Sequence, residues 1–250
     1  MKAMILAAGL GTRLRPLTDD RPKALVEING RTLLEITLAR LRKFGVGKVI
    51  VNVHHFADQV VTYLEMNDNF GMHIEISREE LLLDTGGGLK KAAWFLGDPG
   101  GESNDAAFIL HNVDVLSAID LDRMVRLHRD NHALATLAVQ ERQTSRYLLF
   151  DERHQLCGRR LGLDGIAEIV RSAEHLNALA FCGIHIISSR LFSLMTEEGT
   201  FSIINTYLWL AAAGEQIQAF RADEYYWRDL GKPESIVQAE NDLKRKIVEL

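Results

Sequence analysis

Apolar residues follow two alternating patterns along the first 140 positions of the chain. Short runs rich in apolar residues are typical of strands buried within a sheet, and they occupy residues 3–8, 48–53, 73–77, 107–111 and 133–140. Between the runs, apolar residues return at helical spacing, as at Leu34, Leu38 and Leu41 after a capping Thr32. This alternation predicts an α/β fold with a doubly wound, Rossmann-like sheet.

Further helices are predicted where the same spacing recurs, near residues 56–64, 89–96, 121–128, 202–213 and 233–248. The alternation of strand and helix patterns stops in residues 145–187, which are expected to form antiparallel strands and loops. The sheet should therefore be mixed. No linker or repeat divides the chain. We therefore expect one domain over residues 1–250, with no C-terminal β-helix domain.

Composition narrows the possible partners. The 250 residues are 47% hydrophobic and 25% charged, which suits one large α/β domain. A formal net charge of -5 gives no general attraction for nucleic acid or an anionic membrane. No apolar run approaches the roughly 20 residues of a membrane span. Cys157 and Cys182 form no metal-binding pattern, and we expect a reducing, cytoplasmic environment.

Two glycines and two arginines follow the first predicted strand, at Gly9, Gly11, Arg13 and Arg15. Glycine lets a backbone turn tightly and bring N–H donors against anionic oxygens, and a guanidinium group can bind phosphate with two hydrogen bonds. The loop is no dinucleotide fingerprint, because Leu14 stands where GxGxxG needs glycine, and no Gly-Lys-Ser/Thr follows. A second phosphate-binding cation could come from the segment Arg-Pro-Lys at residues 21–23.

Together, residues 6–18 and 21–25 resemble the signature of sugar-1-phosphate nucleotidyltransferases. The resemblance implies the nucleotide-diphospho-sugar transferase type of fold, and transfer of a nucleoside monophosphate from an NTP, with UTP or GTP favoured, to a sugar 1-phosphate. Arg13 would then stabilise the departing pyrophosphate and Lys23 would bind phosphate at the reacting centre. The loop residues that would wrap the triphosphate are Ala7, Ala8, Gly9, Gly11 and Thr12.

A second glycine cluster, at residues 84–88, is expected to open a helix, where free N–H groups favour oxygen-rich ligands. Simple capping of that helix is the alternative. The segment resembles the acidic-Thr-Gly-Gly segment of the family's N-acetylmuramate-1-phosphate uridylyltransferase and mannose-1-phosphate guanylyltransferase branches. This implies contacts of Thr85, Gly86 and Gly87 with base and sugar, and a role in base recognition for side chains near Glu75 to Glu79, with Glu75 the candidate.

Asp114 ends an apolar strand, where open α/β sheets present ligand-binding groups. By resemblance Asp114 binds the metal and Asn112 the substrate, although Val113 stands where the family usually has glycine or serine. Residues 227–234 resemble a later motif whose aspartate, here Asp229, is the second metal ligand. Two carboxylates suit Mg²⁺, which prefers few protein oxygens together with water and phosphate.

The sugar site is less clearly marked. Gly183 matches the family's Gly-Ile strand beside the sugar pocket, and packing alone is the alternative. The family's Glu-Lys-Pro segment is not recognisable, and Glu168 is the nearest candidate. The sugar, the base and the oligomeric state are not predicted.

Two other functions stay open. A metal-dependent glycosyltransferase could use Asp120 and Asp122 as a DxD pair, unless Asp120 caps the helix that begins there. A catalytically weak nucleotide-binding paralogue is suggested by Val113 and the missing Glu-Lys-Pro segment.

Overall fold

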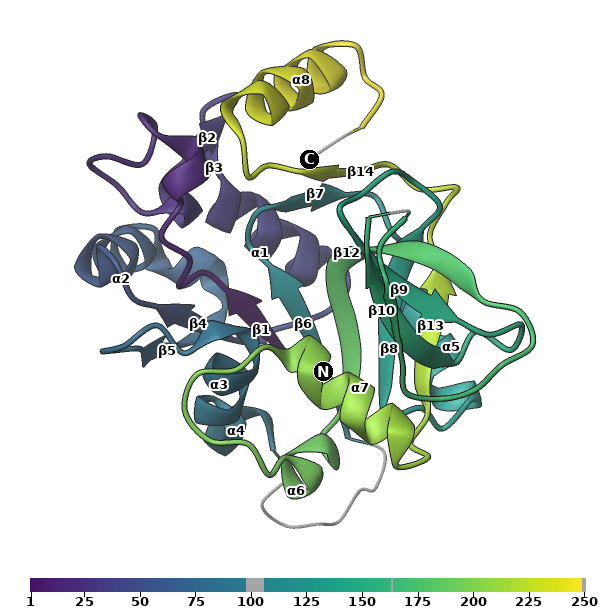
Figure 1. Cartoon of the computed structure of the whole chain (residues 1–250). Helices are drawn as coiled ribbons and strands as arrows, with labels where there is room; N and C mark the ends of the chain where they lie inside the picture. The colour runs from purple at the N-terminus through teal and green to yellow at the C-terminus, as the bar shows by residue number, and fades with distance from the viewer. Residues whose placement is uncertain (98–105, 163, 249–250) are drawn as a thin grey trace.

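A mixed sheet runs through the computed structural model, which describes residues 1–97, 106–162 and 164–248. Among these residues the sheet has ten strands in the order β11-β10-β9-β12-β6-β1-β4-β5, with β8 joined to β12 and β13 joined to β8 (Figure 1). The mixed, doubly wound α/β fold predicted from the sequence is confirmed.

Four parallel strands form one half of the sheet. They are β1 (Lys2–Leu6), β4 (Lys48–Val53), β5 (His73–Arg78) and β6 (Ala107–Asn112). The first strand ends two residues earlier than predicted, which leaves Ala7 and Ala8 in the loop that follows. Because the four strands are parallel, their carboxyl ends lie along one edge, and the polar residues that follow them gather there.

The other half of the sheet is mainly antiparallel, as expected for residues 145–187. Its strands are β8 (Ala135–Gln140), β9 (Arg146–Phe150), β10 (Leu156–Leu161), β11 (Ala167–Ile169) and β12 (Asn177–Ser188). Strand β13 (Ile217–Arg221) was not predicted, and it pairs parallel to β8.

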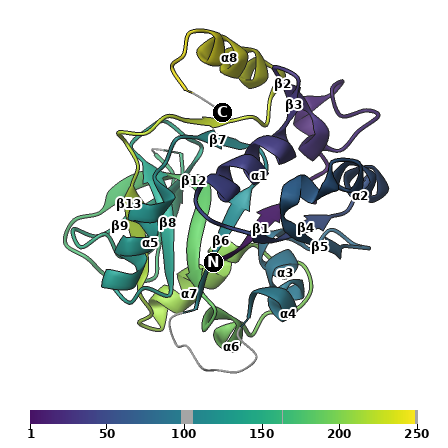
Figure 2. The same ribbon diagram turned by 180° about the vertical axis from the view of Figure 1, so that it is seen from behind.

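Helices cover both faces because neighbouring strand residues point to opposite sides. Ala3 and Ile5 of β1 belong to one core and Met4 belongs to the other. Figure 2 shows the face of the first core, which packs against α1 (Leu33–Lys43), α2 (Ala57–Met66), α5 (Leu121–Asp130) and α8 (Pro233–Lys244). The second core packs against α3 (Asp84–Lys91), α4 (Ala93–Leu96), α6 (Leu191–Leu194) and α7 (Ile203–Ala212).

Several helix ends follow the caps expected from the sequence. The Thr32 side chain accepts a hydrogen bond from the Glu35 amide at the start of α1, and Asp120 accepts one from Arg123 at the start of α5. The last helix ends at Lys244 rather than at residue 248, and the glycine cluster opens α3, which begins at Asp84. No helix among the described residues is long and apolar enough to cross a membrane.

Two short pairs of strands lie outside the main sheet. Strand β2 (Glu27–Ile28) pairs with β3 (Arg31–Thr32), and β7 (Val115–Ser117) pairs antiparallel with β14 (Trp227–Asp229). The second pair brings a C-terminal segment against the chain that follows β6. It therefore links two parts of the sequence that are far apart.

Two buried histidines lie in adjacent strands near the centre of the sheet. His111 of β6 faces Ile184 of β12, next to His185. The Nδ1 atom of His185 lies 3.0 Å from the Tyr207 hydroxyl. Burial, and the proximity of His111, lower the pKa of His185 to about 3, while burial and the charge of Arg40 lower the pKa of His111 to about 4. Both side chains are therefore neutral in the folded protein near neutral pH.

The low pKa values of His111 and His185 predict that the folded protein loses stability in acid. The unfolded chain takes up protons at histidine below a pKa of about 6.5, whereas the folded chain resists protonation down to about pH 4. The free energy of unfolding should thus be constant above pH 6.5 and fall below it, by up to about 1.4 kcal/mol per pH unit for each histidine. Urea titrations at several pH values measure this slope. His185→Gln should make it shallower and the exposed His175→Gln should not; equal slopes in the three proteins would contradict the assignment.

Candidate active site

Hydrogen bonds to Asn52 and Thr18 fix the conformation of the loop after β1. The Ala7 amide donates to Oδ1 of Asn52 at 2.7 Å, and the Thr18 hydroxyl donates to the Gly11 carbonyl oxygen at 2.8 Å. Gly11 has φ of +67°, and a Cβ there would lie 2.9 Å from Cγ2 of Thr18. The loop therefore needs glycine at Gly11, both for its conformation and for its close packing.

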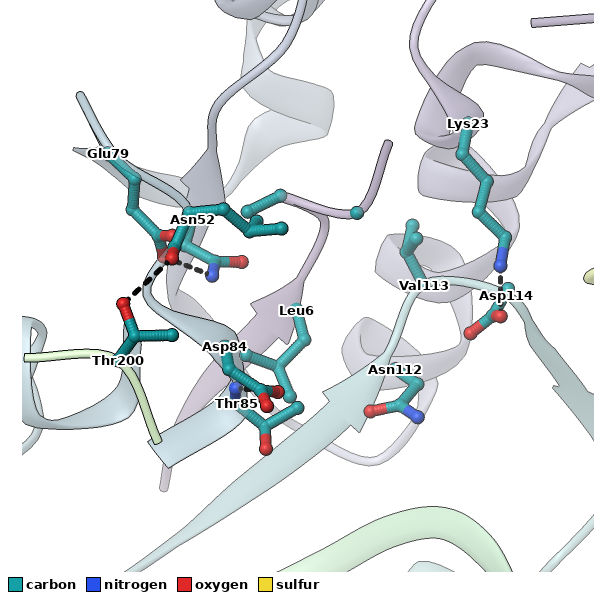
Figure 3. A pocket seen from close by; sticks show the side chains of 13 residues that line it. Leu6, Lys23, Asn52, Glu79, Asp84, Thr85, Asn112, Val113, Asp114 and Thr200 are labelled. Carbon is teal, nitrogen blue, oxygen red and sulfur yellow. Dashed lines mark hydrogen bonds and ion pairs between the residues drawn. The ribbon is translucent and has the colours of Figure 1, made fainter. Parts of the chain in front are cut away.

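Lys23 and Asp114 form an ion pair, as Figure 3 shows. Pro22 is extended, and the short helix η2 (Lys23–Leu25) begins directly after it. The Lys23 ammonium group donates to Oδ2 of Asp114, and both side chains are largely buried. The cation and the carboxylate that the sequence predicted to act together are thus in contact.

Asp229 reaches the same place through the strand pair β7–β14. It lies opposite Val115, and the amide of the next residue, Leu230, donates to the Asp114 carbonyl oxygen at 2.8 Å. A Cβ on Gly231 would be 2.6 Å from Oδ1 of Asp229 and 2.7 Å from Nη2 of Arg13. Asp229 and the Arg13 guanidinium group therefore both lie against Gly231. All four residues predicted to be catalytic lie at one edge of the sheet.

A cavity of about 370 Å³ lies at this edge. Figure 3 shows Lys23 and Asp114 on one side of it and Asp84 and Thr85 on another. Its other lining residues come from the carboxyl ends of β1, β4 and β6, from the segments that follow β1, β5 and β6, and from the segment before α7, namely Leu6, Ala8, Gly9, Asn52, Glu79, Leu82, Asn112, Val113 and Thr200. The cavity thus joins a glycine loop and a cation to a predominantly acidic end.

Two further hollows extend the cavity. The second shares Asn112 with it and is lined also by Arg13, Arg142, Gly183 and Asp229. The third adjoins the second and is lined by residues of β9, β10, β11 and β12 and by residues around the start of α7, among them Arg146, Tyr147, Arg159, Arg160, Glu168, Phe181 and Ser202. Arg146 and Phe181 line both the second and the third, so the three hollows are neighbours, and we refer to them together as the cleft.

Gly183 marks the place where the sheet divides. Strand β12 pairs with β9 as far as Ala180 and with β6 from Ile184 onwards. Gly183 between them has φ of +74°, and a Cβ there would lie 2.9 Å from Nδ2 of Asn112. Only glycine lets Asn112 occupy this gap, so Gly183 shapes the cleft through its backbone.

The glycines of α3 pack against the chain before α7. The amides of Gly86 and Gly87 donate to the Phe201 carbonyl oxygen at 2.9 and 3.3 Å. A Cβ on Gly87 would come within 2.3 Å of the Gly199 carbonyl oxygen, and one on Gly86 within 2.4 Å of the Phe201 ring. Neither glycine lines the cavity, whereas Thr85 does. The glycines thus position Thr85, whose hydroxyl oxygen accepts a hydrogen bond from the Ile203 amide at 3.0 Å.

The remaining predicted residues lie in different places. Glu75 pairs with His73 at 3.2 Å and does not line the cavity, so the geometry does not favour Glu75 as the base-recognition residue. Glu168 lies in the third hollow, where it pairs with Arg159 at 2.6 Å. Thr12 is exposed at the start of the short helix η1 (Thr12–Leu14).

Asn52 was not identified from the sequence, and Glu79 was named only as the end of the range in which Glu75 was the candidate. Asn52 links Glu79 to the loop after β1. Its Nδ2 donates to Oε1 of Glu79 at 2.7 Å, and its Oδ1 accepts from the Ala7 amide. Glu79 is 5% exposed, and its Oε2 accepts from the Leu83 amide at 2.9 Å. The sequence did carry a signal, because each residue lies at or just beyond the carboxyl end of a predicted strand, as Asp114 does.

Comparison with known proteins identifies the family. The family model described as nucleotidyl transferase matches residues 2–152. The chain belongs to this family. An N-acetylmuramate alpha-1-phosphate uridylyltransferase of Caulobacter vibrioides is 35% identical over 247 residues, which cover 95% of this chain and 95% of that protein. This nucleotidyl transferase therefore matches a relative of nearly its own length.

Two other similarities are more distant. A mannose-1-phosphate guanylyltransferase of Mycobacterium tuberculosis is 30% identical over 98% of this chain, which spans 65% of that protein's length. The solved inositol-1-phosphate CTP transferase of T. maritima shares the fold, with a TM-score of 0.73 and 16% identity over 99% of this chain and 98% of that one. Membership of the family confirms the predicted enzyme class, a sugar-1-phosphate nucleotidyltransferase.

Replacing glycine by alanine should have different effects at Gly87 and at Gly9, because the surroundings of the added methyl group differ. Gly87→Ala should destabilise the nucleotidyl transferase by about 1–3 kcal/mol, because the new Cβ would overlap the Gly199 carbonyl. Gly9→Ala should leave stability within about 0.5 kcal/mol, since a Cβ there meets nothing within 4 Å. Gly9 lines the cavity, so its variant should lose activity while staying folded. Thermal unfolding and turnover measure the two effects, and the reverse pattern would contradict the geometry.

Proposed function

We propose that this nucleotidyl transferase moves the uridylyl group of UTP to the 1-phosphate of a sugar that bears a carboxylate, with Mg²⁺ and with release of pyrophosphate. The observation that carries the proposal is the convergence of Arg13, Lys23, Asp114 and Asp229 at one end of the cleft. The choice of UTP is supported by the uridylyltransferase that matches 95% of this chain.

The two carboxylates fit a magnesium ion. Asp114 and Asp229 come from adjacent backbone segments, and Oδ2 of Asp114 already has a cationic partner in Lys23. Among the described residues no group of three or more His, Cys, Asp or Glu side chains gathers to hold a metal. Two protein carboxylates leave room for the water and phosphate oxygens that Mg²⁺ prefers. When bound, the ion would neutralise charge on the phosphate oxygens.

The chain's own residues position the reactants. An oxygen of the sugar phosphate attacks the α-phosphorus of UTP, a new P–O bond forms, and the bond to pyrophosphate breaks with its electron pair. Lys23 would exchange its partner Asp114 for a phosphate oxygen, and Arg13 would bind the pyrophosphate as negative charge develops on it. The reaction needs no protein nucleophile, so catalysis rests on orientation and on neutralised charge.

The third hollow supports an acidic sugar. Arg146, Arg159 and Arg160 line it, against the one carboxylate of Glu168. Arg159 is paired with that carboxylate, whereas Arg146 and Arg160 have no carboxylate partner among the described residues. Two such guanidinium groups beside a sugar site favour a second anionic group on the substrate. N-acetylmuramate, named in the uridylyltransferase relative, carries a carboxylate.

The two rival functions find less support. Asp120 caps α5 at a hydrogen-bond distance of 2.9 Å, and neither it nor Asp122 lines the cleft. Val113 is only 3% exposed and packs in the core, with its amide donating to the Leu6 carbonyl oxygen at 3.1 Å. The valine therefore takes up little of the cavity, and its presence is compatible with turnover.

The reaction is tested by pyrophosphate release from UTP and N-acetylmuramate 1-phosphate. Asp114→Asn and Asp229→Asn should each lower kcat by about 100- to 1000-fold, because each removes a carboxylate that would hold the metal ion, and with it the neutralisation of charge on the phosphate oxygens. Asp122→Asn, a change of the same kind on the exposed surface of α5, should leave kcat unchanged. Full activity of either of the first two variants, or undiminished activity in EDTA, would contradict the proposal.

Sugar recognition is tested by comparing N-acetylmuramate 1-phosphate with N-acetylglucosamine 1-phosphate, which lacks the carboxylate. Arg146→Gln and Arg160→Gln should raise KM for the acidic sugar about 10-fold or more, the size of a lost charged hydrogen bond. KM for the neutral sugar should not change. Arg126→Gln, on the exposed face of α5, is the matched control. An equal effect on both sugars would count against carboxylate recognition.

A further inference from the structure

Arg142 lies two residues beyond the end of β8 and lines the second hollow of the cleft. Its guanidinium carbon is 3.7 Å from the centre of the Trp227 ring, so the planar group stacks on the indole. Its Nη2 donates to the Phe181 carbonyl oxygen at 2.8 Å. Trp227 is itself fixed, because its Nε1 donates to the Cys182 carbonyl oxygen at 2.8 Å. The guanidinium group is thus held in place by the folded chain alone.

The positive charge of Arg142 is not balanced by a carboxylate. No Asp or Glu side chain pairs with it in the part of the chain that the structure describes, and its buried Nε has no hydrogen-bond partner there. The neighbouring Cys182 thiol supplies no counter-charge, because burial raises the pKa of that thiol to about 12. An unpaired, pre-oriented guanidinium group beside a cleft favours a bound anion.

The second hollow lies between the other two. It shares Asn112, labelled in Figure 3, with the cavity, and it shares Phe181 with the third hollow. A sugar 1-phosphate whose ring lies in the third hollow must reach the α-phosphorus of a triphosphate in the cavity. Its phosphate would therefore lie in the second hollow. Basic side chains predominate there, since Asp229 is the one carboxylate among its lining residues and the basic ones are Arg13, Arg142, Arg146, Arg228 and Lys232.

Among these five basic residues, Arg142 is the best placed to hold a phosphate. Arg228 is already paired with Asp242 at 2.7 Å, and Arg13 lies beside Asp229. Lys232 and Arg146 are exposed side chains. Arg142 combines an unpaired charge with a fixed orientation, which reduces the entropy lost when a ligand binds.

We propose that the guanidinium group of Arg142, stacked on Trp227, binds the phosphate of the sugar 1-phosphate and so holds its oxygen in position for attack on the triphosphate. The inference rests on the proposed function, because it takes the sugar to lie in the third hollow and the triphosphate in the cavity. Arg142 lies outside the segments by which the chain resembles its family, so no motif indicated this role.

The role of Arg142 is tested with two sugars. Arg142→Gln should raise KM about 10-fold or more for N-acetylmuramate 1-phosphate and equally for N-acetylglucosamine 1-phosphate, because both carry the phosphate. Arg146→Gln, in contrast, is expected to affect the acidic sugar only. KM for UTP should not change. Arg142→Lys keeps the charge but not the planar fork, so it should recover part of the loss. Unchanged KM for both sugar phosphates, or a rise in KM for UTP alone, would overturn the proposal.

Arg171→Gln is the matched control for a structural effect. Arg171 is also half-buried, and its Nη2 donates to the carbonyl oxygens of Ala211 and Glu215, each at 2.9 Å. It lines none of the three hollows. Both substitutions remove hydrogen bonds to carbonyl oxygens, so Tm should fall in both proteins. KM for the sugar phosphates should rise only in Arg142→Gln, and an equal rise in both would contradict phosphate binding.

Trp227 fluorescence measures binding without turnover. Trp94 and Trp209 are exposed, and replacing both with phenylalanine leaves Trp227 as the one tryptophan of the chain. The 1-phosphates of glucose, mannose, N-acetylglucosamine and N-acetylmuramate are titrated with and without a non-hydrolysable UTP analogue. At least one should change the emission, with a Kd about 10-fold or more higher in Arg142→Gln. Equal Kd values, or no change with any sugar phosphate, would overturn the inference. A protein that shows this binding but releases no pyrophosphate from UTP would fail the proposed function alone.

Discussion

Asp114 is the residue at which three distant parts of the chain meet. Its carboxylate accepts a hydrogen bond from Lys23 of the N-terminal segment, and its carbonyl oxygen accepts one from the amide of Leu230. Because it follows β6, it is also fixed to the middle of the sheet. These two contacts, together with the pairing of β7 and β14, keep Lys23, Asp114 and Asp229 at the same end of the cleft, where groups that could bind phosphate and metal are needed.

The sheet supplies the rigidity that this arrangement needs. Parallel strands β1, β4, β5 and β6 bring polar residues to one edge, and the division of β12 at Gly183 opens a gap there. Charged groups are distributed unevenly along the cleft. Cations lie beside the glycine loop, carboxylates lie at the end near Asp84, and arginines line the third hollow. Under the proposed function, this distribution of charge favours one orientation of a triphosphate and of an acidic sugar phosphate.

Much of this could be predicted from local pattern. The buried strands and the helix from Thr32 were predicted because hydrophobic spacing and capping are local properties. Strand β13 and the short pair β7–β14 were missed, since their pairing depends on partners far along the chain. Asp229 was found only by resemblance for the same reason. No periodicity marks a three-residue strand.

Other site residues were missed or given a different position because their roles depend on tertiary packing. Gly86 and Gly87 suggested ligand contacts, yet their amides are taken by Phe201. Glu75 was chosen from a range whose other end, Glu79, lines the cavity. Asp84 has φ of +58°, and nothing in the sequence indicates it, since aspartate at a helix start usually acts as a cap.

The most direct test of the account is a crystal structure with Mn²⁺ and a non-hydrolysable UTP analogue, in which anomalous scattering locates the metal. The account predicts an ion within coordination distance, about 2.2 Å, of carboxylate oxygens of both Asp114 and Asp229. It also predicts that the Lys23 ammonium group has moved from Asp114 to a phosphate oxygen. An ion bound away from either carboxylate, or a triphosphate bound outside the cavity, would contradict it.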